Sequence, residues 1–147
     1  FRVLADAFRD MGPLGGILSA LREPGEEWRL ILSCDTPLGD DALIRELVAK
    51  ARDLSEADAD IIVPQTPDGR LQPLCAIWRR RVSVPLEDHL RRLTSDPQSS
   101  RSQFGVQRFV HSLKFLPHHY GKAGNLRNIN TMRDYLAALA DREGPGR

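Results

Sequence analysis

The first stretch of this sequence that could do chemistry is the glycine-rich segment GPLGG at residues 12–16. Glycines at a helix start let the backbone approach a ligand closely, and the free amides of the first helical turn favour an anion. The segment matches neither the GxGxxG pattern nor the P-loop. It therefore indicates either an anion site or an ordinary tight turn between a strand and a helix.

The second stretch is CDTP at residues 34–37, which directly follows the apolar run WRLILS at residues 28–33. A carboxylate at Asp35 would project into the crevice where a nucleotide lies in an α/β sheet. Magnesium prefers one or two carboxylates together with substrate phosphate oxygens, so a single aspartate is sufficient. The alternative is that Asp35 only initiates the turn before Pro37.

The third stretch is NINT at residues 128–131, in which two asparagines alternate around an isoleucine. In an extended segment Asn128 and Asn130 lie on the same side. Each amide can both donate and accept a hydrogen bond, which suits a polar heterocycle or a phosphate. The alternative is a loop that satisfies its own backbone before Thr131 caps a helix.

The elements that must position these stretches follow from the hydrophobic periodicity, which predicts strands alternating with helices. Strands are expected at 1–5, 28–33, 59–64, 74–78 and 114–116, and helices at 14–21, 43–51, 86–93, 106–113 and 132–139. The turn TPDG at 66–69 predicts that the 74–78 strand returns as a hairpin. The segments 95–102 and 117–124 are expected to be loops, the latter with His118 and His119 exposed. This order predicts a mainly parallel sheet with helices on both faces and ligands at the carboxyl ends of its strands.

Composition excludes several classes of protein. The chain has 147 residues, of which 41% are hydrophobic and 28% charged, as in a globular domain. Its apolar runs are too short to cross a bilayer. The two cysteines form no CxxC pair and no secretory signal is visible, so a cytoplasmic protein without disulfides is expected. Nucleic-acid binding is disfavoured because only 6% of the residues are aromatic and the isoelectric point is near 8.0.

The formal net charge of +1 conceals two halves of opposite charge. Residues 1–69 carry 7 basic and 14 acidic side chains, whereas residues 70–147 carry 14 basic and 6 acidic ones. The basic half is rich in arginine, whose guanidinium group suits phosphate oxygens. Either an anionic ligand or a set of solvated helix faces accounts for this pattern.

The ordered set GPLGGILSAL, WRLILSCDTP, QPLCAIW and NINT followed by a helix resembles the molybdenum cofactor guanylyltransferase family, over residues 1 to around 140. The resemblance implies a Rossmann-like, three-layer nucleotidyltransferase fold in the α/β class. It implies a reaction that joins GMP from GTP to the phosphate of molybdenum-loaded molybdopterin and releases pyrophosphate. It further implies Mg²⁺, with Mn²⁺ as an alternative, and a monomer that hands its product to molybdenum-insertion proteins or molybdoenzymes.

On the nucleotide side, the resemblance assigns roles to four residues of this sequence. Asp35 matches the family aspartate that binds magnesium, contacts the nucleotide and supports catalysis. Asp6 matches a second nucleotide-contacting aspartate. Gly12 and Gly16 match glycines that line the site. The acidic half, residues 1–69, is thus expected to hold the nucleotide and the metal.

On the acceptor side, the resemblance points to the basic half, residues 70–147. Asn128 and Asn130 match the paired asparagines near the acceptor, and Gln72 matches a polar residue before proline that lines the pocket. Arg101 matches a basic residue that the family places after the preceding helix, with Arg108 as the alternative.

The sequence departs from the family in two places. Met132 stands where the family has proline after the NINT motif. The family's opening glycine-rich loop, LAGGxSxRMGxDK, has no counterpart in the 147 residues. The chain therefore resembles the family without its N-terminal βα part, so an unpaired sheet edge and no activity of this segment alone are expected. The alternatives are a related transferase that uses CTP or another phosphorylated acceptor, and a non-catalytic binding module.

Overall fold

The computed structural model describes residues 3–6, 8, 10–34, 41–55, 58–95, 105–121, 131–134 and 136–137. The strands are β1 (Trp28–Leu32), β2 (Ile61–Gln65), β3 (Cys75–Arg79) and β4 (Phe115–His119). The helices are α1 (Pro13–Arg22), α2 (Asp41–Asp53), α3 (Ser83–Ser95) and α4 (Val106–Val110), with the 3₁₀ turn η1 (Arg80–Val82) before α3. Residues 132–134 and 136–137 are also helical.

The strands form one sheet in the order β1-β3-β2-β4. Strands β2 and β4 are parallel, and β3 is antiparallel to both of its neighbours, β1 and β2. Strands β1, β2 and β4 consequently run in the same direction. The prediction of a mainly parallel sheet holds for strand direction but is wrong for pairing in these four strands, because β3 is inserted between β1 and β2.

The reversal of β3 has a local cause in the turn at residues 66–69. Gly69 donates from its backbone N–H to the carbonyl of Thr66 at 2.8 Å and has a φ of +84°. Proline inside this turn and glycine at its end are the residues that such a turn requires. The predicted hairpin is therefore confirmed, and it returns the chain antiparallel to β2.

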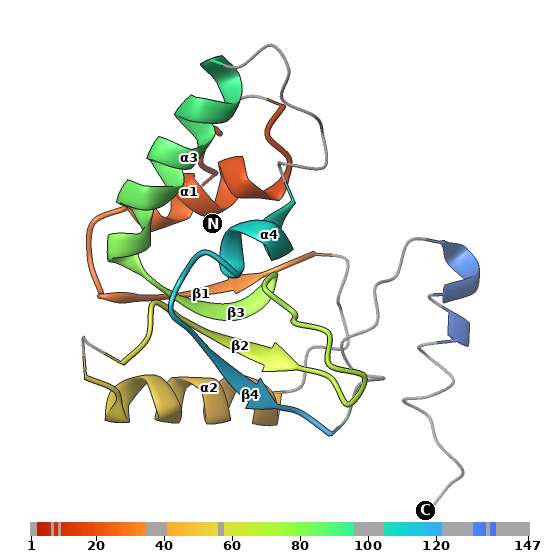
Figure 1. The fold of residues 1–147 in the computed structure, drawn as a ribbon. Coiled ribbons are helices and arrows are strands. Elements are labelled where there is room, and N and C mark those ends of the chain that lie inside the picture. Colours follow the sequence, from red (N-terminus) through yellow and green to blue (C-terminus); the bar gives the residue numbers. More distant parts are fainter. Residues whose placement is uncertain are drawn as a thin grey trace, which may run out of the picture.

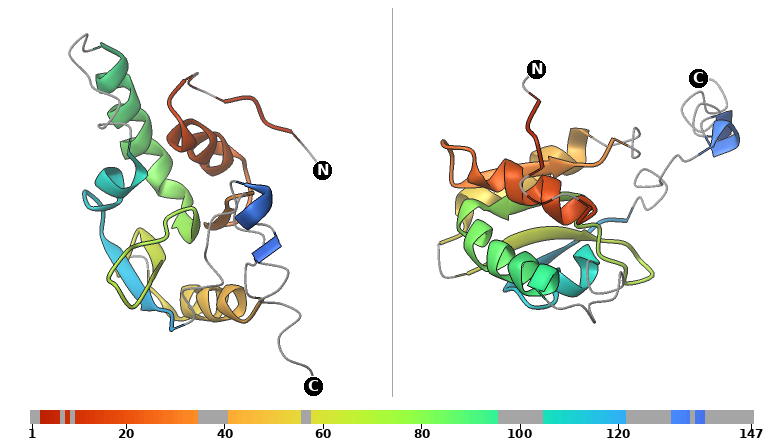
Figure 2. Two further views of the ribbon diagram at one scale, coloured as in Figure 1. Left: turned by 90° about the vertical axis from the view of Figure 1, so that its right-hand side faces the viewer. Right: turned by 90° about the horizontal axis from the view of Figure 1, so that it is seen from above.

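Helices cover both faces of the sheet, so the molecule has the three predicted layers (Figures 1 and 2). Strand residues alternate between two cores: Ala76 and Trp78 of β3 pack beneath α1, α3 and α4, whereas Ile77 packs against α2. The larger core contains Leu14, Ile17, Leu18, Leu21, Ile61, Val63, Leu71, Ala76, Trp78, Val82, Leu86, Leu90, Val106, Phe109 and Val110. The smaller core contains Leu43, Leu47, Ala51, Ile62, Cys75, Ile77 and Tyr120.

One fully buried charge ties β1 to the rest of the fold. Arg79 is only 2% exposed and donates to the carbonyl oxygens of Ala59 at 2.8 Å and Ser55 at 2.6 Å. Its guanidinium carbon lies 4.1 Å from the ring centroid of Trp28, and Nη1 lies 3.4 Å from Glu27 Oε1. Burying this group is therefore compensated by hydrogen bonds and an ion pair.

Two predicted segments differ from the structure. Residues 3–6 form no strand, and Val3 is 92% exposed. The apolar pattern there favours an extended chain, but a strand also needs a neighbour to pair with, and β1 pairs only with β3 among the described residues. Conversely, Pro117, His118 and His119 belong to β4 and not to a loop, because an edge strand tolerates a proline.

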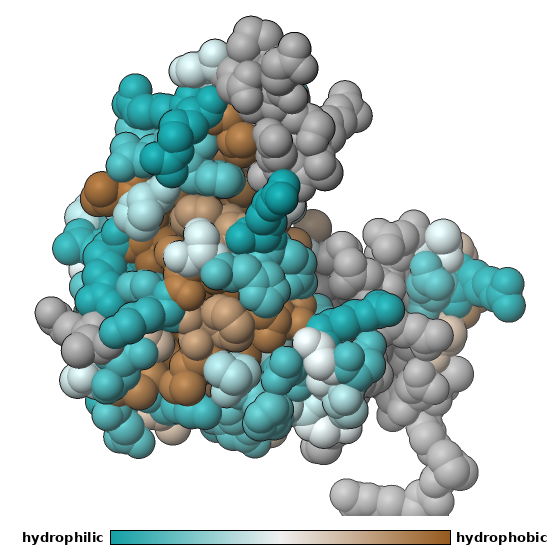
Figure 3. Space-filling view, viewed as in Figure 1, coloured by the Kyte–Doolittle hydropathy of each residue, from teal (hydrophilic) through white to brown (hydrophobic). Residues whose placement is uncertain are grey.

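The surface of the described residues is mixed in character. On the face seen in Figure 3, apolar side chains gather over the middle of the molecule and hydrophilic ones surround them. Within the ranges that the structure describes, no helix has the length and apolar character needed to cross a bilayer.

Candidate functional site

One cavity lies between α1 and the carboxyl end of β1, and we call it the β1 cavity. It has a volume of about 450 Å³. It is lined by Pro13, Gly16, Ile17, Ala20, Leu30, Ile31, Leu32, Ser33, Cys34 and Leu74. The predicted strand-to-helix turn and the strand that precedes Asp35 are thus brought to one place.

The start of α1 shows why glycines occupy this turn. Gly12 has a φ of +56° and a ψ of −149°, a conformation open to glycine but strained for other residues. A Cβ atom at Gly15 would lie 2.7 Å from the carbonyl oxygen of Phe8, and one at Gly16 would lie 3.6 Å from Asp6 Oδ1. Asp6 therefore lies against the first turn of α1, beside Gly15 and Gly16, of which Gly16 is predicted to line the nucleotide site.

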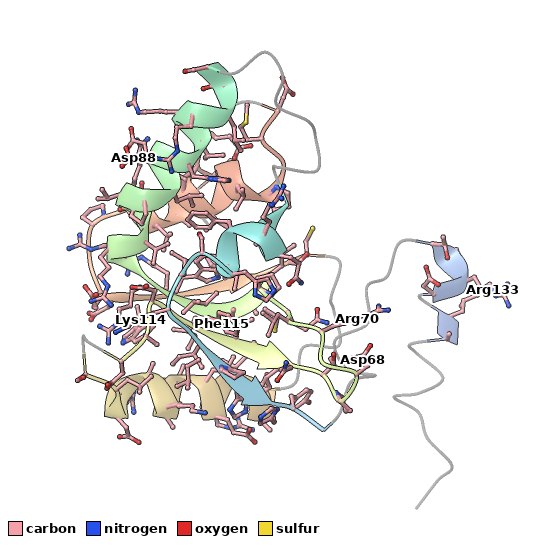
Figure 4. All side chains as sticks on the ribbon, in the orientation of Figure 1. Asp68, Arg70, Asp88, Lys114, Phe115 and Arg133 are labelled. Atoms are coloured by element: carbon pink, nitrogen blue, oxygen red, sulfur yellow. The ribbon has the colours of Figure 1, made fainter. Side chains whose placement is uncertain are left out.

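The second cavity lies between the β2–β3 hairpin, α4 and the start of β4, and we call it the glutamine groove. Its volume is about 470 Å³, within the range of small-molecule sites. It is lined by Gln65, Gly69, Arg70, Leu71, Gln72, Gln107, His111 and Phe115. Figure 4 shows Arg70 near the tip of the hairpin and Phe115 at the start of β4.

The two cavities are neighbours because one short segment borders both of them. Leu71 and Gln72 line the glutamine groove, and Leu74 lines the β1 cavity. The backbone N–H of Gln72 donates to the carbonyl of Pro64 at 2.8 Å, and Ser33 N–H donates to Leu74 O at 2.7 Å. The segment 71–74 is thus fixed to the ends of both β2 and β1. Two ligands, one in each cavity, would lie on either side of this segment.

The mouth of the glutamine groove carries an ion pair. Arg70 Nε lies 3.1 Å from Asp68 Oδ2, and the Arg70 side chain is 80% exposed. A hydrogen bond from the Thr66 hydroxyl and the nearby Arg70 charge hold the pKa of Asp68 below its usual value. Asp68 is therefore ionised and forms an exposed ion pair with Arg70 at the mouth of the groove.

Among the described residues, no group of three or more His, Cys, Asp or Glu residues is arranged to hold a metal ion. A magnesium ion bound with a nucleotide needs only one or two protein carboxylates, since phosphate oxygens and water complete its shell. Asp6, exposed at the edge of the glycine turn, fits that requirement by its chemistry.

The structure brings some of the predicted site residues together. Asp6, Gly12 and Gly16 share the start of α1, and Gln72 lines the neighbouring groove. Asp35, Arg101, Asn128 and Asn130 lie outside the described residues, so their roles stay predictions. Arg108, the alternative to Arg101, is exposed on α4 and does not line the groove.

Sequence reasoning missed the remaining polar residues of the glutamine groove. Gln65 ends β2, so the rule that ligands gather at the carboxyl ends of strands could have selected it. Gln107 and His111 lie on the polar side of α4 and its C-cap, and nothing in the sequence distinguishes them from ordinary surface residues. Arg70 follows the hairpin turn and offered no signal of its own.

A three-layer α/β fold with cavities at the carboxyl ends of β1 and β2 is typical of proteins that bind nucleotides. Residues 1–112 match the family model of the MobA-like NTP transferase domain. The chain belongs to this family.

Relatives and solved structures agree with the family. A Bacillus subtilis protein named "Probable molybdenum cofactor guanylyltransferase" is 40% identical over 86 residues, which are 58% of this chain and 41% of the relative. A Clostridium perfringens protein of the same name is 29% identical over 97% of this chain and 69% of its own length. The molybdopterin-guanine dinucleotide biosynthesis protein A of Archaeoglobus fulgidus superposes with a TM-score of 0.64 at 19% identity, covering 85% of this chain and 60% of that one. The chain thus spans between 41% and 69% of the length of these three proteins.

Proposed function

We propose that the protein to which this chain belongs is a molybdenum cofactor guanylyltransferase. It transfers GMP from GTP to the terminal phosphate of molybdenum-loaded molybdopterin and releases pyrophosphate. We assign the reaction to the cytoplasm and to a monomer that passes its product to molybdenum-insertion proteins or molybdoenzymes. The names of the relatives and the resemblance in the ordered motifs support this proposal.

The observation that carries the proposal is the pair of cavities at the carboxyl ends of β1 and β2, which share one bordering segment. A transferase must bind a nucleotide and an acceptor at once, with their reacting phosphates in contact. The segment 71–74 borders both the β1 cavity and the glutamine groove, and the ends of β1 and β2 hold it by backbone hydrogen bonds. A rigid partition of this kind keeps the two substrates in a fixed relative position.

On the nucleotide side, the chain offers backbone amides and carboxylates. The amides of the first turn of α1 favour phosphate oxygens, and the glycines there allow a close approach. Asp6 lies against that turn, and Asp35 follows β1 in the sequence by three residues. In the proposed site these two aspartates would hold Mg²⁺, with Mn²⁺ as a substitute. When bound, the ion would neutralise phosphate charge.

On the acceptor side, the proposal uses polar amides and arginine. Gln72 lines the glutamine groove, and its backbone is fixed by the bond to Pro64. Asn128 and Asn130 would add two further amides, and Arg101 would supply positive charge for the acceptor's phosphate. The basic character of residues 70–147 suits an anionic acceptor.

The chemical step is an in-line displacement between two polyanions. An oxygen of the acceptor phosphate attacks the α-phosphorus of GTP, the new oxygen–phosphorus bond forms, and the bond to the bridging oxygen of the β-phosphate breaks. Pyrophosphate leaves with that electron pair. The protein contributes positioning and charge neutralisation, because the reaction needs no covalent intermediate on a side chain.

The test is the transfer of α-labelled GMP by the natural full-length protein to molybdopterin, with GTP and magnesium supplied. Asp35→Asn is expected to reduce the rate by at least about a hundredfold, and Asp6→Asn by a smaller factor, because each would remove a carboxylate proposed to hold the magnesium ion that neutralises the phosphates. Asp53→Asn, an exposed carboxylate at the end of α2, serves as the matched control. Transfer by Asp35→Asn at the rate of the control would disprove the assigned role.

Two other functions are separated by simple measurements. A related transferase of this family would consume CTP or ATP in preference to GTP, so the three nucleotides are compared in the same assay. A non-catalytic binding module would show no GTP binding with magnesium by calorimetry. The family membership of residues 1–112 favours transfer over mere binding.

A further inference from the structure

The segment 71–74, which borders both cavities, lies outside strands β2 and β3. Its carbonyl groups therefore need hydrogen-bond donors from outside a regular strand ladder. Each of the four carbonyls has such a donor. The carbonyls of Gln72 and Leu74 accept from backbone N–H groups, of Cys75 at 3.0 Å and of Ser33 at 2.7 Å. The other two carbonyls accept from side chains of more distant residues.

The two side-chain donors differ in where they lie. The carbonyl of Pro73 accepts from the indole Nε1 of Trp78 at 3.0 Å, and Trp78 is 0% exposed within the larger core. The carbonyl of Leu71 accepts from Gln107 Nε2 at 2.6 Å, and the Gln107 side chain lies at the surface of α4. Gln107 can therefore be changed without disturbing the core, whereas Trp78 cannot.

Helix α4 gives the Gln107 side chain a fixed base. Three apolar residues of this short helix are buried in the larger core, Val106, Phe109 and Val110. Close packing of this kind holds a helix in one position. The bond from Gln107 to the Leu71 carbonyl spans 36 residues of the sequence, so it ties the segment 71–74 to an element that the core already holds.

We propose that Gln107 is a positioning residue for the transfer reaction: its side-chain amide holds the segment 71–74, and with it the boundary between the two substrates. The inference rests on the proposed function, because it assumes one ligand in each cavity. Two substrates react rapidly only while their reacting atoms stay aligned, and a displacement of about 1 Å can cost up to about a hundredfold in rate. Gln107 acts through the Leu71 carbonyl and needs no contact with either substrate.

The first experiment measures transfer in Gln107→Met, because methionine keeps the length of the side chain and lacks the N–H donor. GMP transfer by the natural full-length protein is followed in single turnovers, with the protein and the acceptor in excess over α-labelled GTP. The rate constant is expected to fall at least about fivefold, while the Kd for GTP from calorimetry changes less than about twofold. A loss of folded protein would lower the amplitude and not the rate constant, so this readout separates positioning from stability.

The second experiment measures amide hydrogen exchange in the same variant. The backbone N–H groups of Gln72 and Cys75, which bond within and beside the segment, are expected to exchange at least about fivefold faster. Exchange at Ile77, in the centre of β3, is expected to stay unchanged. Arg92→Met, which likewise replaces an exposed polar side chain of a helix, is the matched control on α3. It is expected to behave like the wild type in both experiments.

The outcomes separate this inference from the proposed function. A lower rate constant together with faster exchange in Gln107→Met supports the inference. An unchanged rate constant overturns it, and so does a lower rate constant without faster exchange, because Gln107 would then act directly on a substrate. Absence of GMP transfer by the wild type would instead remove the proposed function. The exchange experiment would then decide alone: faster exchange supports the holding role of Gln107, and unchanged exchange overturns it.

Discussion

The two outer strands of the sheet are built differently. At one edge, β1 exposes Leu30 (38%) and Leu32 (51%) and contains no proline. At the other edge, β4 contains Pro117, and His118 Nε2 lies 2.8 Å from Glu46 Oε2 of α2. Strand β1 thus exposes apolar side chains. Strand β4 instead lacks one backbone N–H donor, at Pro117, and carries the polar pair of His118 and Glu46.

The difference indicates which of the two edge strands is suited to remain without a further strand beside it. Exposed sheet edges in natural proteins are blunted by proline and polar or charged side chains, because unpaired N–H and C=O groups would otherwise pair with another strand. Strand β4 follows this rule and borders the polar glutamine groove. Strand β1 does not, and it borders a cavity whose lining is mostly apolar. The β1 side therefore has the apolar character of an interior surface.

The largest effect in this comparison is expected at Arg79 of β3, whose guanidinium group lies over the Trp28 ring of β1. Arg79→Ala removes the donor to the carbonyls of Ala59 and Ser55 and the cation over Trp28. Leaving two carbonyl groups without a partner is expected to lower the free energy of unfolding by about 2–4 kcal/mol, measured by urea denaturation. The neighbouring exposed residue gives a matched control, Arg80→Ala, with a change within about 0.5 kcal/mol. Equal stability of the two variants would show that Arg79 does not anchor β1.

A smaller effect compares packing at the two edges directly. Phe115 of β4 is half-buried against the larger core, whereas Leu32 of β1 is half-exposed. Phe115→Ala is expected to cost about 2 kcal/mol, and Leu32→Ala less than about 1 kcal/mol in the chain of residues 1–147. Thermal and urea unfolding of both variants measure the difference. A cost at Leu32 as large as at Phe115 would mean that the β1 edge is already covered, for instance by association between chains.

Local signals explain what the sequence could predict of the fold. The apolar period of Leu14, Ile17, Leu18 and Leu21 marks the buried face of α1, and all four are at most 3% exposed. The turn at 66–69 likewise predicts the hairpin. Residues 3–6 failed as a strand because pairing depends on a neighbour that periodicity does not reveal. Pro117 led to the opposite error, because it favoured a loop where the structure has a strand. Proline is excluded from central strands, but β4 is an edge strand.

The site was harder to predict because its parts come from distant segments. Gln107 reaches Leu71 across 36 residues, and His118 reaches Glu46 across 72. Gly12 and Gly16 could be selected because a glycine-rich turn is a local pattern. Gln65 and Gln107 could not be selected together, because only the folded chain brings the end of β2 and the start of α4 to one groove.

The next effect concerns self-association of the chain through the outer edges of β1 and β4. Leu32→Lys places a charge on β1 and is expected to raise the concentration at which residues 1–147 self-associate, because charged edges resist strand pairing. Pro117→Val restores a backbone donor to β4 and is expected to lower that concentration. Light scattering over a concentration series compares the two variants with the wild type. Unchanged association in both would mean that neither edge governs the solution behaviour of the chain.

The smallest effect lies at the hairpin beside β4 and depends on pH. The Thr66 hydroxyl and the Arg70 charge hold the pKa of Asp68 below its value in the unfolded chain. A lowered pKa in the folded state means that the ionised form stabilises the fold, so this contribution is complete above the unfolded pKa and is lost as pH falls through the folded pKa.

The free energy of unfolding of the wild type is therefore expected to exceed that of Asp68→Asn by a constant amount above about pH 5. The difference is expected to vanish in stronger acid. Urea denaturation at a series of pH values measures this, with Asp88→Asn on α3 as the reference. A difference that does not change with pH would show that Asp68 acts by shape and not by charge.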